Sequence, residues 1–113
     1  MTTPRTLAPQ QTAALEAFAG GVRSLLGDRL VALKLFGSHA RGDAGPDSDL
    51  DVLVLVEEAT PTLENHVLDL AFHVNLVHDV YISPRVIARR IFEDPVWRST
   101  PFIRALETEG AAL

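Results

Sequence analysis

Apolar residues recur at helical spacing near the start of the chain. Leu15, Phe18, Val22, Leu25 and Leu26 share one face of a helix, so residues 9–28 are predicted to form an amphipathic helix. Two glycines inside this segment lower its helix propensity, each by up to ~1 kcal/mol relative to alanine. The apolar face outweighs that cost, and the pattern predicts a first helix.

Three shorter apolar runs, residues 30–37, 49–56 and 75–82, are predicted as β-strands. The first is mostly apolar on both faces, which is typical of an interior strand. Between the second and third runs, Thr60 is a predicted helix cap and Pro61 the first helical residue. The apolar stripe of that helix comprises Leu63, Val67, Leu70, Ala71 and Val74.

Two more helices are predicted after the third strand, one over residues 83–92 and one beginning at Thr100 and Pro101. A helix between the second and third strands indicates a parallel pair joined by a crossover. The shorter link between the first and second strands leaves their relative direction open. The predicted fold class is α/β (α+β), with a small mixed three-stranded sheet and flanking helices.

The composition fits one globular domain over residues 1–113, with a modest core. Hydrophobic residues make up 47% of the chain, which is typical of a folded protein. No run approaches the ~18 apolar residues of a membrane span, and residues 1–10 do not resemble a signal peptide. A net charge of −5 argues against a general nucleic-acid binder. The absence of cysteine excludes disulfides and fits a cytoplasmic protein.

Two aspartates, Asp49 and Asp51, head the second predicted strand. Alternation places both side chains on one face, where two carboxylates repel each other unless a positive charge lies between them. Oxygen ligands without cysteine favour Mg²⁺ or Mn²⁺. The alternative is that the strand begins later and leaves the aspartates in a solvated turn, which is the more common reading of such a pair alone.

A turn of small residues ends the first predicted strand, at Gly37 and Ser38. Glycine permits close approach of backbone to a ligand, Ser38 offers a hydroxyl and an N–H, and a helix start favours phosphate. Arg41 could add a guanidinium to the same anion. Joined to the aspartate pair, the turn predicts phosphates facing metal-binding carboxylates.

A third carboxylate is expected on a neighbouring strand, and Asp79 fits because it is the only acid in residues 75–82. Alone, Asp79 would be read as a strand-end aspartate paired with an arginine. With Asp49 and Asp51 present, the catalytic interpretation is favoured.

The motif of Gly37-Ser38, ten residues and then Asp49-Leu50-Asp51, with Ala40-Arg41-Gly42 after the Gly-Ser, resembles the DNA polymerase β-like nucleotidyltransferases. The chain is most similar to their minimal nucleotidyltransferase (MNT) branch, whose members pair with HEPN toxins. The resemblance implies that Gly37 and Ser38 contact the β- and γ-phosphates of ATP, with Arg41 as an auxiliary.

The resemblance also implies a two-metal transfer of a nucleotide. Asp49 and Asp51 would hold Mg²⁺ and the triphosphate, and Asp79 would complete a second Mg²⁺ site and help to activate the acceptor hydroxyl. Two metals stabilise both the attacking and the leaving oxygen of an in-line displacement.

Features outside the motif have two interpretations each. Arg85, Arg89 and Arg90 lie on one predicted short helix, as a solvated face or as a docking surface for an acidic partner or the nucleotide. Trp97 is either core or a partner contact. Aromatic residues are only 6% of the chain, so stacking on RNA bases receives little support.

Three functions remain open. The favoured one is transfer of AMP to a hydroxyl, expected to be a tyrosine, of a HEPN-type ribonuclease toxin, which makes the chain an antitoxin. The others are neutralisation of a toxin by binding alone and transfer to a small molecule. So small a domain leaves its acceptor to be bound largely by another chain or a second copy, and neither membrane nor direct nucleic-acid binding is expected.

Overall fold

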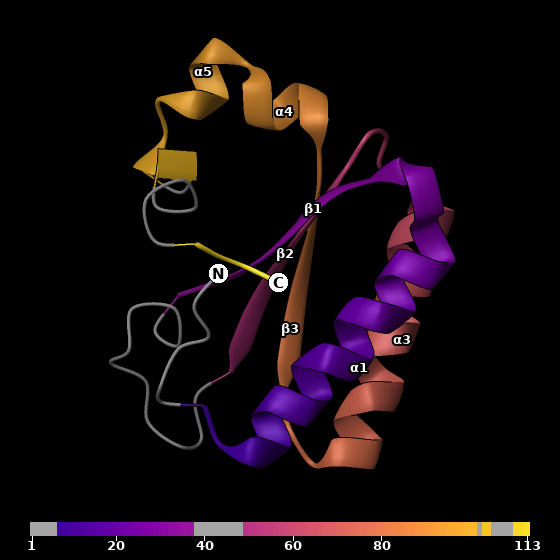
Figure 1. Ribbon diagram of the computed structural model, residues 1–113. Coiled ribbons are helices and arrows are strands. Elements are labelled where there is room, and N and C mark those ends of the chain that lie inside the picture. The colour runs from indigo at the N-terminus through magenta and orange to yellow at the C-terminus, as the bar shows by residue number, and fades with distance from the viewer. Residues whose placement is uncertain (1–6, 38–48, 102, 105–109) are drawn as a thin grey trace.

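The computed structural model describes residues 7–37, 49–101, 103–104 and 110–113. Figure 1 shows a sheet with two long helices on one side and short helices at one end. In chain order the elements are α1 (Pro9–Leu26), a 3₁₀ turn (Gly27–Arg29), β1 (Leu30–Phe36), β2 (Leu50–Val56), α3 (Pro61–His78), β3 (Ile82–Ala88), α4 (Arg89–Glu93), α5 (Pro95–Arg98) and β4 (Ala111–Ala112).

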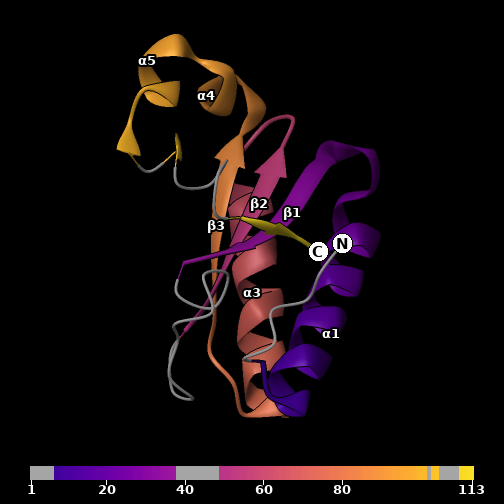
Figure 2. The ribbon, with the colours of Figure 1, turned by 60° about the vertical axis from the view of Figure 1, so that its left-hand side comes forward.

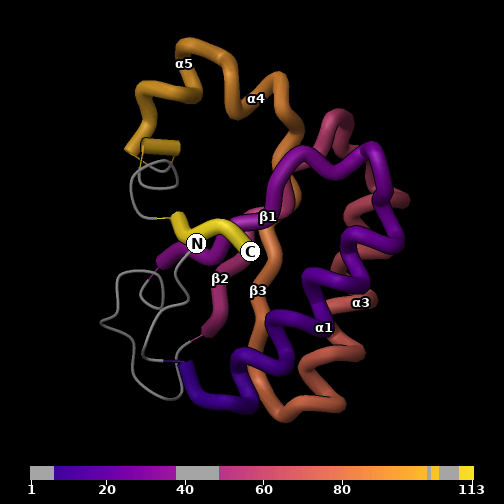
Figure 3. Tube along the Cα trace, viewed as in Figure 1, coloured from indigo at the N-terminus to yellow at the C-terminus, as the bar shows by residue number. Residues whose placement is uncertain are grey.

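The described sheet has four strands in the order β3-β2-β1-β4, one more than predicted. β1 runs antiparallel to β2 and β4, whereas β2 and β3 are parallel, so the mixed sheet is confirmed. β2 has a parallel neighbour as predicted, but that neighbour is Ile82–Ala88 rather than residues 75–82. β4 has only two residues, too few to form a recognisable pattern in the sequence, and it runs back beside β1 (Figure 3). Leu113 extends this pairing by donating its N–H to the Leu33 carbonyl at 3.0 Å.

The main core lies between the sheet and the two long helices, α1 and α3. From β2 it receives alternate residues, which include Val52, Val54 and Val56. Leu53 and Leu55 point to the opposite face, where they pack with Ile103 in a second, smaller cluster. Figure 2 shows α4 and α5 well away from α1 and α3. Because β2 is apolar on both faces, it lies inside the sheet.

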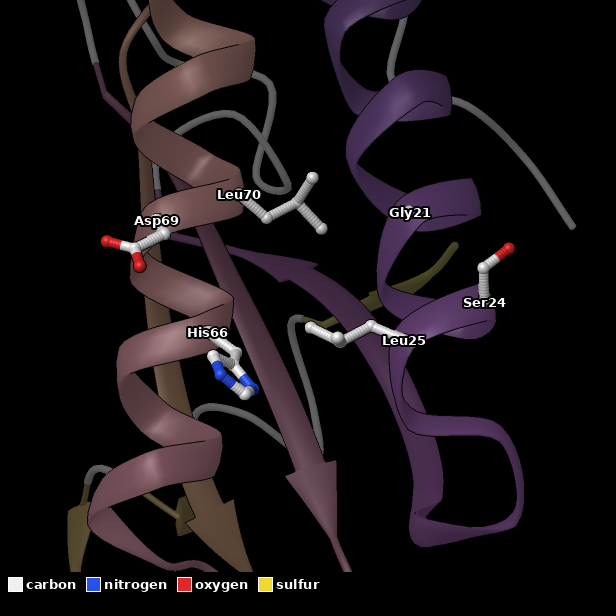
Figure 4. A pocket seen from close by; sticks show the side chains of 6 residues that line it. All are labelled: Gly21, Ser24, Leu25, His66, Asp69 and Leu70. Atoms are coloured by element: carbon white, nitrogen blue, oxygen red, sulfur yellow. The ribbon is translucent and has the colours of Figure 1, made fainter.

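The two long helices begin where their residues predict. α1 starts at Pro9, and the Thr60 hydroxyl accepts the Leu63 N–H at 3.1 Å as the cap of α3. A Cβ at Gly21 would lie 2.8 Å from Leu70 Cδ2, and Figure 4 shows Leu70 pointing from α3 toward α1. A glycine inside α1 therefore allows α3 to approach closely.

The prediction for the third strand is wrong. Residues 75–78 continue α3, and the strand is Ile82–Ala88, where a helix was predicted. Asn75 determines this boundary because its side chain binds the Ile82 backbone in both directions, with Ile82 N to Oδ1 at 2.8 Å and Nδ2 to Ile82 O at 3.2 Å. Pro84 suits an edge strand, which leaves one side of its backbone unpaired.

The helical prediction survives only in part beyond β3. α4 covers only the last four residues of the predicted helix and extends to Glu93. α5 follows after Asp94, whose Oδ1 accepts the Val96 N–H at 2.8 Å. After Thr100, the described residues Pro101, Ile103 and Arg104 are helical, as predicted. The Thr100 hydroxyl accepts the Ile103 N–H at 3.4 Å, which is the cap that the sequence indicates.

Among the residues that the structure describes, no helix is long and apolar enough to cross a membrane.

Candidate active site

The end of β1 meets the beginning of β2, and this junction brings two of the predicted site residues together. The strands are antiparallel, with Phe36 opposite Asp51, so Gly37 follows directly beside the carboxylate. Gly37 has φ +77°, and a Cβ on it would lie 2.6 Å from Asp51 Oδ2. A larger residue would therefore be strained and would displace the Asp51 carboxylate.

The two aspartates differ in exposure. Asp49 precedes β2 and is exposed, whereas Asp51 is half-buried within the strand. By alternation, Asp51 shares the face of Leu53 and Leu55, away from α1 and α3. Asp51 thus stands at the head of a buried strand, whereas Asp49 lies in the exposed position just before it. Ser38 and Arg41 lie outside the described residues.

Asp79 occupies a helix terminus, which corrects its predicted place within a strand. It is exposed, follows the last residue of α3, and has left-handed dihedrals of φ 53° and ψ 50°. Its carbonyl accepts a hydrogen bond from Gln10 Nε2 at 2.7 Å. Within the described ranges, no group of three or more His, Cys, Asp or Glu side chains is arranged to hold a metal ion. Asp49, Asp51 and Asp79 are therefore not gathered into one ligand cluster.

Asp79 nevertheless belongs to the same end of the sheet as Asp49. The parallel strands β2 and β3 begin side by side, and the Leu50 N–H donates to the Tyr81 carbonyl at 2.8 Å. Asp79 lies two residues before Tyr81, and Asp49 lies one residue before Leu50. Backbone pairing thus brings the two segments together although it makes no metal cluster.

The neighbours of the aspartate pair on β3 are Ser83 and Arg85, which the sequence analysis did not assign to this site. Ser83 is in register with Asp51, and Arg85 with Leu53. Paired residues share a face of the sheet, so a hydroxyl and a guanidinium stand beside the aspartate strand where an acid was expected. Ser83-Pro84 had been interpreted as a helix start, which concealed this register.

The predicted arginine cluster is divided between two elements. Arg85 belongs to β3, while Arg89 begins α4 and pairs with Glu57 at 2.9 Å and Glu93 at 3.3 Å. The hydrogen bond to Glu57, with the nearby negative charges, raises the pKa of the Arg89 guanidinium above its ordinary value. Arg89 therefore remains charged and fastens α4 to the end of β2.

A hollow away from this junction lies between α1 and α3, with a volume of about 420 Å³. In Figure 4, His66 points into the gap, whereas Asp69 and Ser24 point away from it. Polar groups that diverge cannot act on one substrate atom. This hollow therefore presents no converging pair of catalytic groups.

Comparisons with known proteins agree that the chain is similar to nucleotidyltransferases. A family model described as a nucleotidyltransferase domain matches residues 15–107. The Methanocaldococcus jannaschii protein named "Putative protein adenylyltransferase MJ0141" is 36% identical over 98 residues, which are 85% of this chain and 91% of the relative.

Two solved structures are similar over most of the chain. One, described as a "putative minimal nucleotidyltransferase", is 26% identical with a TM-score of 0.56, over 96% of this chain and 99% of the other. The second is a toxin–antitoxin crystal structure with AMP-PNP, at 19% identity and a TM-score of 0.57, over 86% of this chain and 70% of the other. At that identity, the second likeness concerns the fold alone.

Proposed function

This chain belongs to the nucleotidyltransferase family, in its minimal branch, and we propose that it transfers AMP from ATP to a hydroxyl group of a partner protein. The observation that carries the proposal is the Asp51 carboxylate against Gly37, where a strand pair ends in a glycine turn. The partner we propose is a HEPN-type toxin, modified on a tyrosine and thereby neutralised.

The residues at the junction fit magnesium. Asp49 and Asp51 supply hard oxygen donors. Because Gly37 has no Cβ, no side-chain atom of residue 37 crowds Asp51 Oδ2. We propose that these two carboxylates hold Mg²⁺, with two ions in the complete site. Bound magnesium would neutralise charge on the triphosphate and on the leaving pyrophosphate.

The remaining proposed roles belong to residues around this pair. Gly37 and Ser38 would contact the β- and γ-phosphates, and Arg41 would assist them. Asp79 is proposed as the third acid, supported by the side-by-side starts of β2 and β3. From that end of the sheet, its carboxylate would accept the proton of the acceptor hydroxyl.

In the proposed reaction the acceptor oxygen forms a bond to the α-phosphorus of ATP. The bond between that phosphorus and the bridging oxygen of pyrophosphate breaks, and pyrophosphate leaves. The chain itself would contribute orientation and electrostatics. Asp51 is held in place because the strand residues that follow it, Val52–Val56, are buried.

A protein acceptor is supported by the relative named for protein adenylylation and by the fold shared with a chain of a toxin–antitoxin crystal structure. It is also supported by size, since the described elements after β3 are two short helices, a short helical stretch and a two-residue strand. These elements do not enclose an acceptor. We therefore expect a second polypeptide to present its hydroxyl to the junction.

The test is incubation of the purified protein with ATP, Mg²⁺ and a HEPN-type protein sought among the neighbouring reading frames, followed by intact mass. We expect the partner to gain AMP and pyrophosphate to be released, and the Asp51→Asn variant to produce neither. A partner that stays unmodified, while the protein is folded and binds ATP, overturns the proposal. Neutralisation that survives Asp49→Ala with Asp51→Ala would instead indicate an antitoxin that acts by binding.

A further inference from the structure

The helix α3 has two apolar faces, although packing on the sheet uses only one. Leu63, Val67, Ala71 and Val74 form its buried face. On the other side, Leu68, Phe72 and Leu76 recur every four residues and are 50%, 66% and 68% exposed. An amphipathic helix at a protein surface normally turns polar residues outward. These three exposed residues thus take no part in packing α3 on the sheet.

The outer stripe, Leu68, Phe72 and Leu76, borders a groove of about 460 Å³ between α3 and the start of β3. Tyr81, 66% exposed, lines the same groove. From typical side-chain areas, these four residues expose roughly 500 Å², which is about the size of the largest apolar patch on a typical monomer. This area is a large part of the ~800 Å² that each partner gives to a standard interface. The area is therefore sufficient to form the centre of a dimer interface.

The adjoining sheet edge is closed to an added strand. Asn75 occupies both the N–H and the carbonyl of Ile82, which are therefore directed away from β2. By alternation along the strand, the backbone nitrogen and carbonyl of Pro84 also point away from β2. Proline has no N–H to donate to an added strand. Because strand addition depends on such groups, the groove fits a helix rather than an extended peptide.

Polar side chains along α3 suit one helical occupant. The exposed carboxylates of Glu64 and Asp69 lie in its first half, beside His66, and His73 and His78 lie in its second half, where an imidazole N–H can donate to a carboxylate. An antiparallel copy of α3 would place Glu64 opposite His78 and Asp69 opposite His73, with Leu68 near Leu76. A two-fold axis pairs each patch with itself in this way.

We propose that the outer stripe binds a second copy of this chain, with α3 packed antiparallel against its own copy. Phe72 lies near the two-fold axis, and Leu68 and Leu76 of the two copies alternate around it. The junction of β1 and β2 takes no part in this interface, so dimerisation does not depend on the transferase function proposed above.

Sedimentation equilibrium and light scattering of the full chain test the interface. We expect a mass of about twice the 12.3 kDa of one chain. Phe72→Glu should weaken dimerisation at least about thirtyfold, as for a central interface residue. Val96→Glu is the matched control, because Val96 is 75% exposed on α5 and should change nothing. Circular dichroism verifies that each variant is folded, and Asp51→Asn should dimerise normally.

Engineered cysteines test the antiparallel arrangement. The chain has no cysteine of its own, so any disulfide must form between the introduced residues. Mixing Leu68→Cys with Leu76→Cys protein should give the mixed disulfide as the main oxidised product. Equal or greater crosslinking of Leu68→Cys with itself would overturn the arrangement. A wild-type chain that remains monomeric to the highest concentration tested, or a Phe72→Glu variant that dimerises normally, overturns the proposal and leaves the groove to a different protein.

Discussion

The strands β2 and β3 lie side by side, each seven residues long and parallel in register, yet only β2 could be located from the sequence. β2 is buried by the main core on one face and a smaller cluster on the other, so nearly every residue after Asp51 is apolar. β3 is an edge strand that contains Ser83, Pro84 and Arg85. Its residues therefore do not form the continuous apolar run of an interior strand.

The difference carries over to the candidate site. Gly37 and Asp51 are joined by neighbouring strands whose pattern is clear, and the structure places them in contact. Asp79 was assigned through a strand that does not exist, and it ends a helix instead. A site residue could be positioned from this sequence only where the local pattern also determined the element that carries it.

The largest expected effect concerns the β1–β2 junction. Asp51→Asn keeps the shape of the side chain and removes its charge, so we expect the transfer rate to fall on the order of 10²–10³-fold. Pyrophosphate release and the intact mass of the acceptor measure the rate. The matched control is Asp69→Asn, an exposed carboxylate on α3. Unchanged transfer by Asp51→Asn would remove the β2 aspartate from the chemistry.

Gly37→Ala tests the same junction through the backbone. The added Cβ would collide with Asp51 Oδ2 and displace the carboxylate, so transfer should fall on the order of 10–100-fold. The positive φ should also cost about 1–2 kcal/mol of unfolding free energy. Gly27→Ala provides the control, because Gly27 has φ +52° but a Cβ there would meet nothing within 4 Å. It should lose stability and keep its activity.

Asn75→Ala tests what holds β3 in place. The change removes two hydrogen bonds to the Ile82 backbone, and we expect the free energy of unfolding to fall by about 1–3 kcal/mol. Urea denaturation measures this loss, with the exposed Asn65→Ala on the same helix as reference for helix propensity. Equal stability of the two variants would show that Asn75 does not determine the start of the strand.

The smallest expected effect is that of Asp79→Asn. Asparagine tolerates the left-handed conformation at the end of α3, so the cap should survive while the carboxylate is lost. We expect transfer to fall less than for Asp51→Asn, because Asp79 is exposed. Thermal denaturation should show no change in Tm. Full activity would exclude Asp79 as the third acid.

The sequence alone determined α1, β1, β2 and the start of α3, because a buried face and a proline after a capping threonine are local patterns. It also determined that Asp51 heads a core strand beside a glycine turn. Tertiary structure decided the position of β3 and the small strand β4, since an edge strand and a two-residue pairing are stabilised by contacts distant in the chain. It likewise decided that Ser83 and Arg85, rather than an acid, adjoin the aspartate strand, because register is a relation between strands and no single segment encodes it.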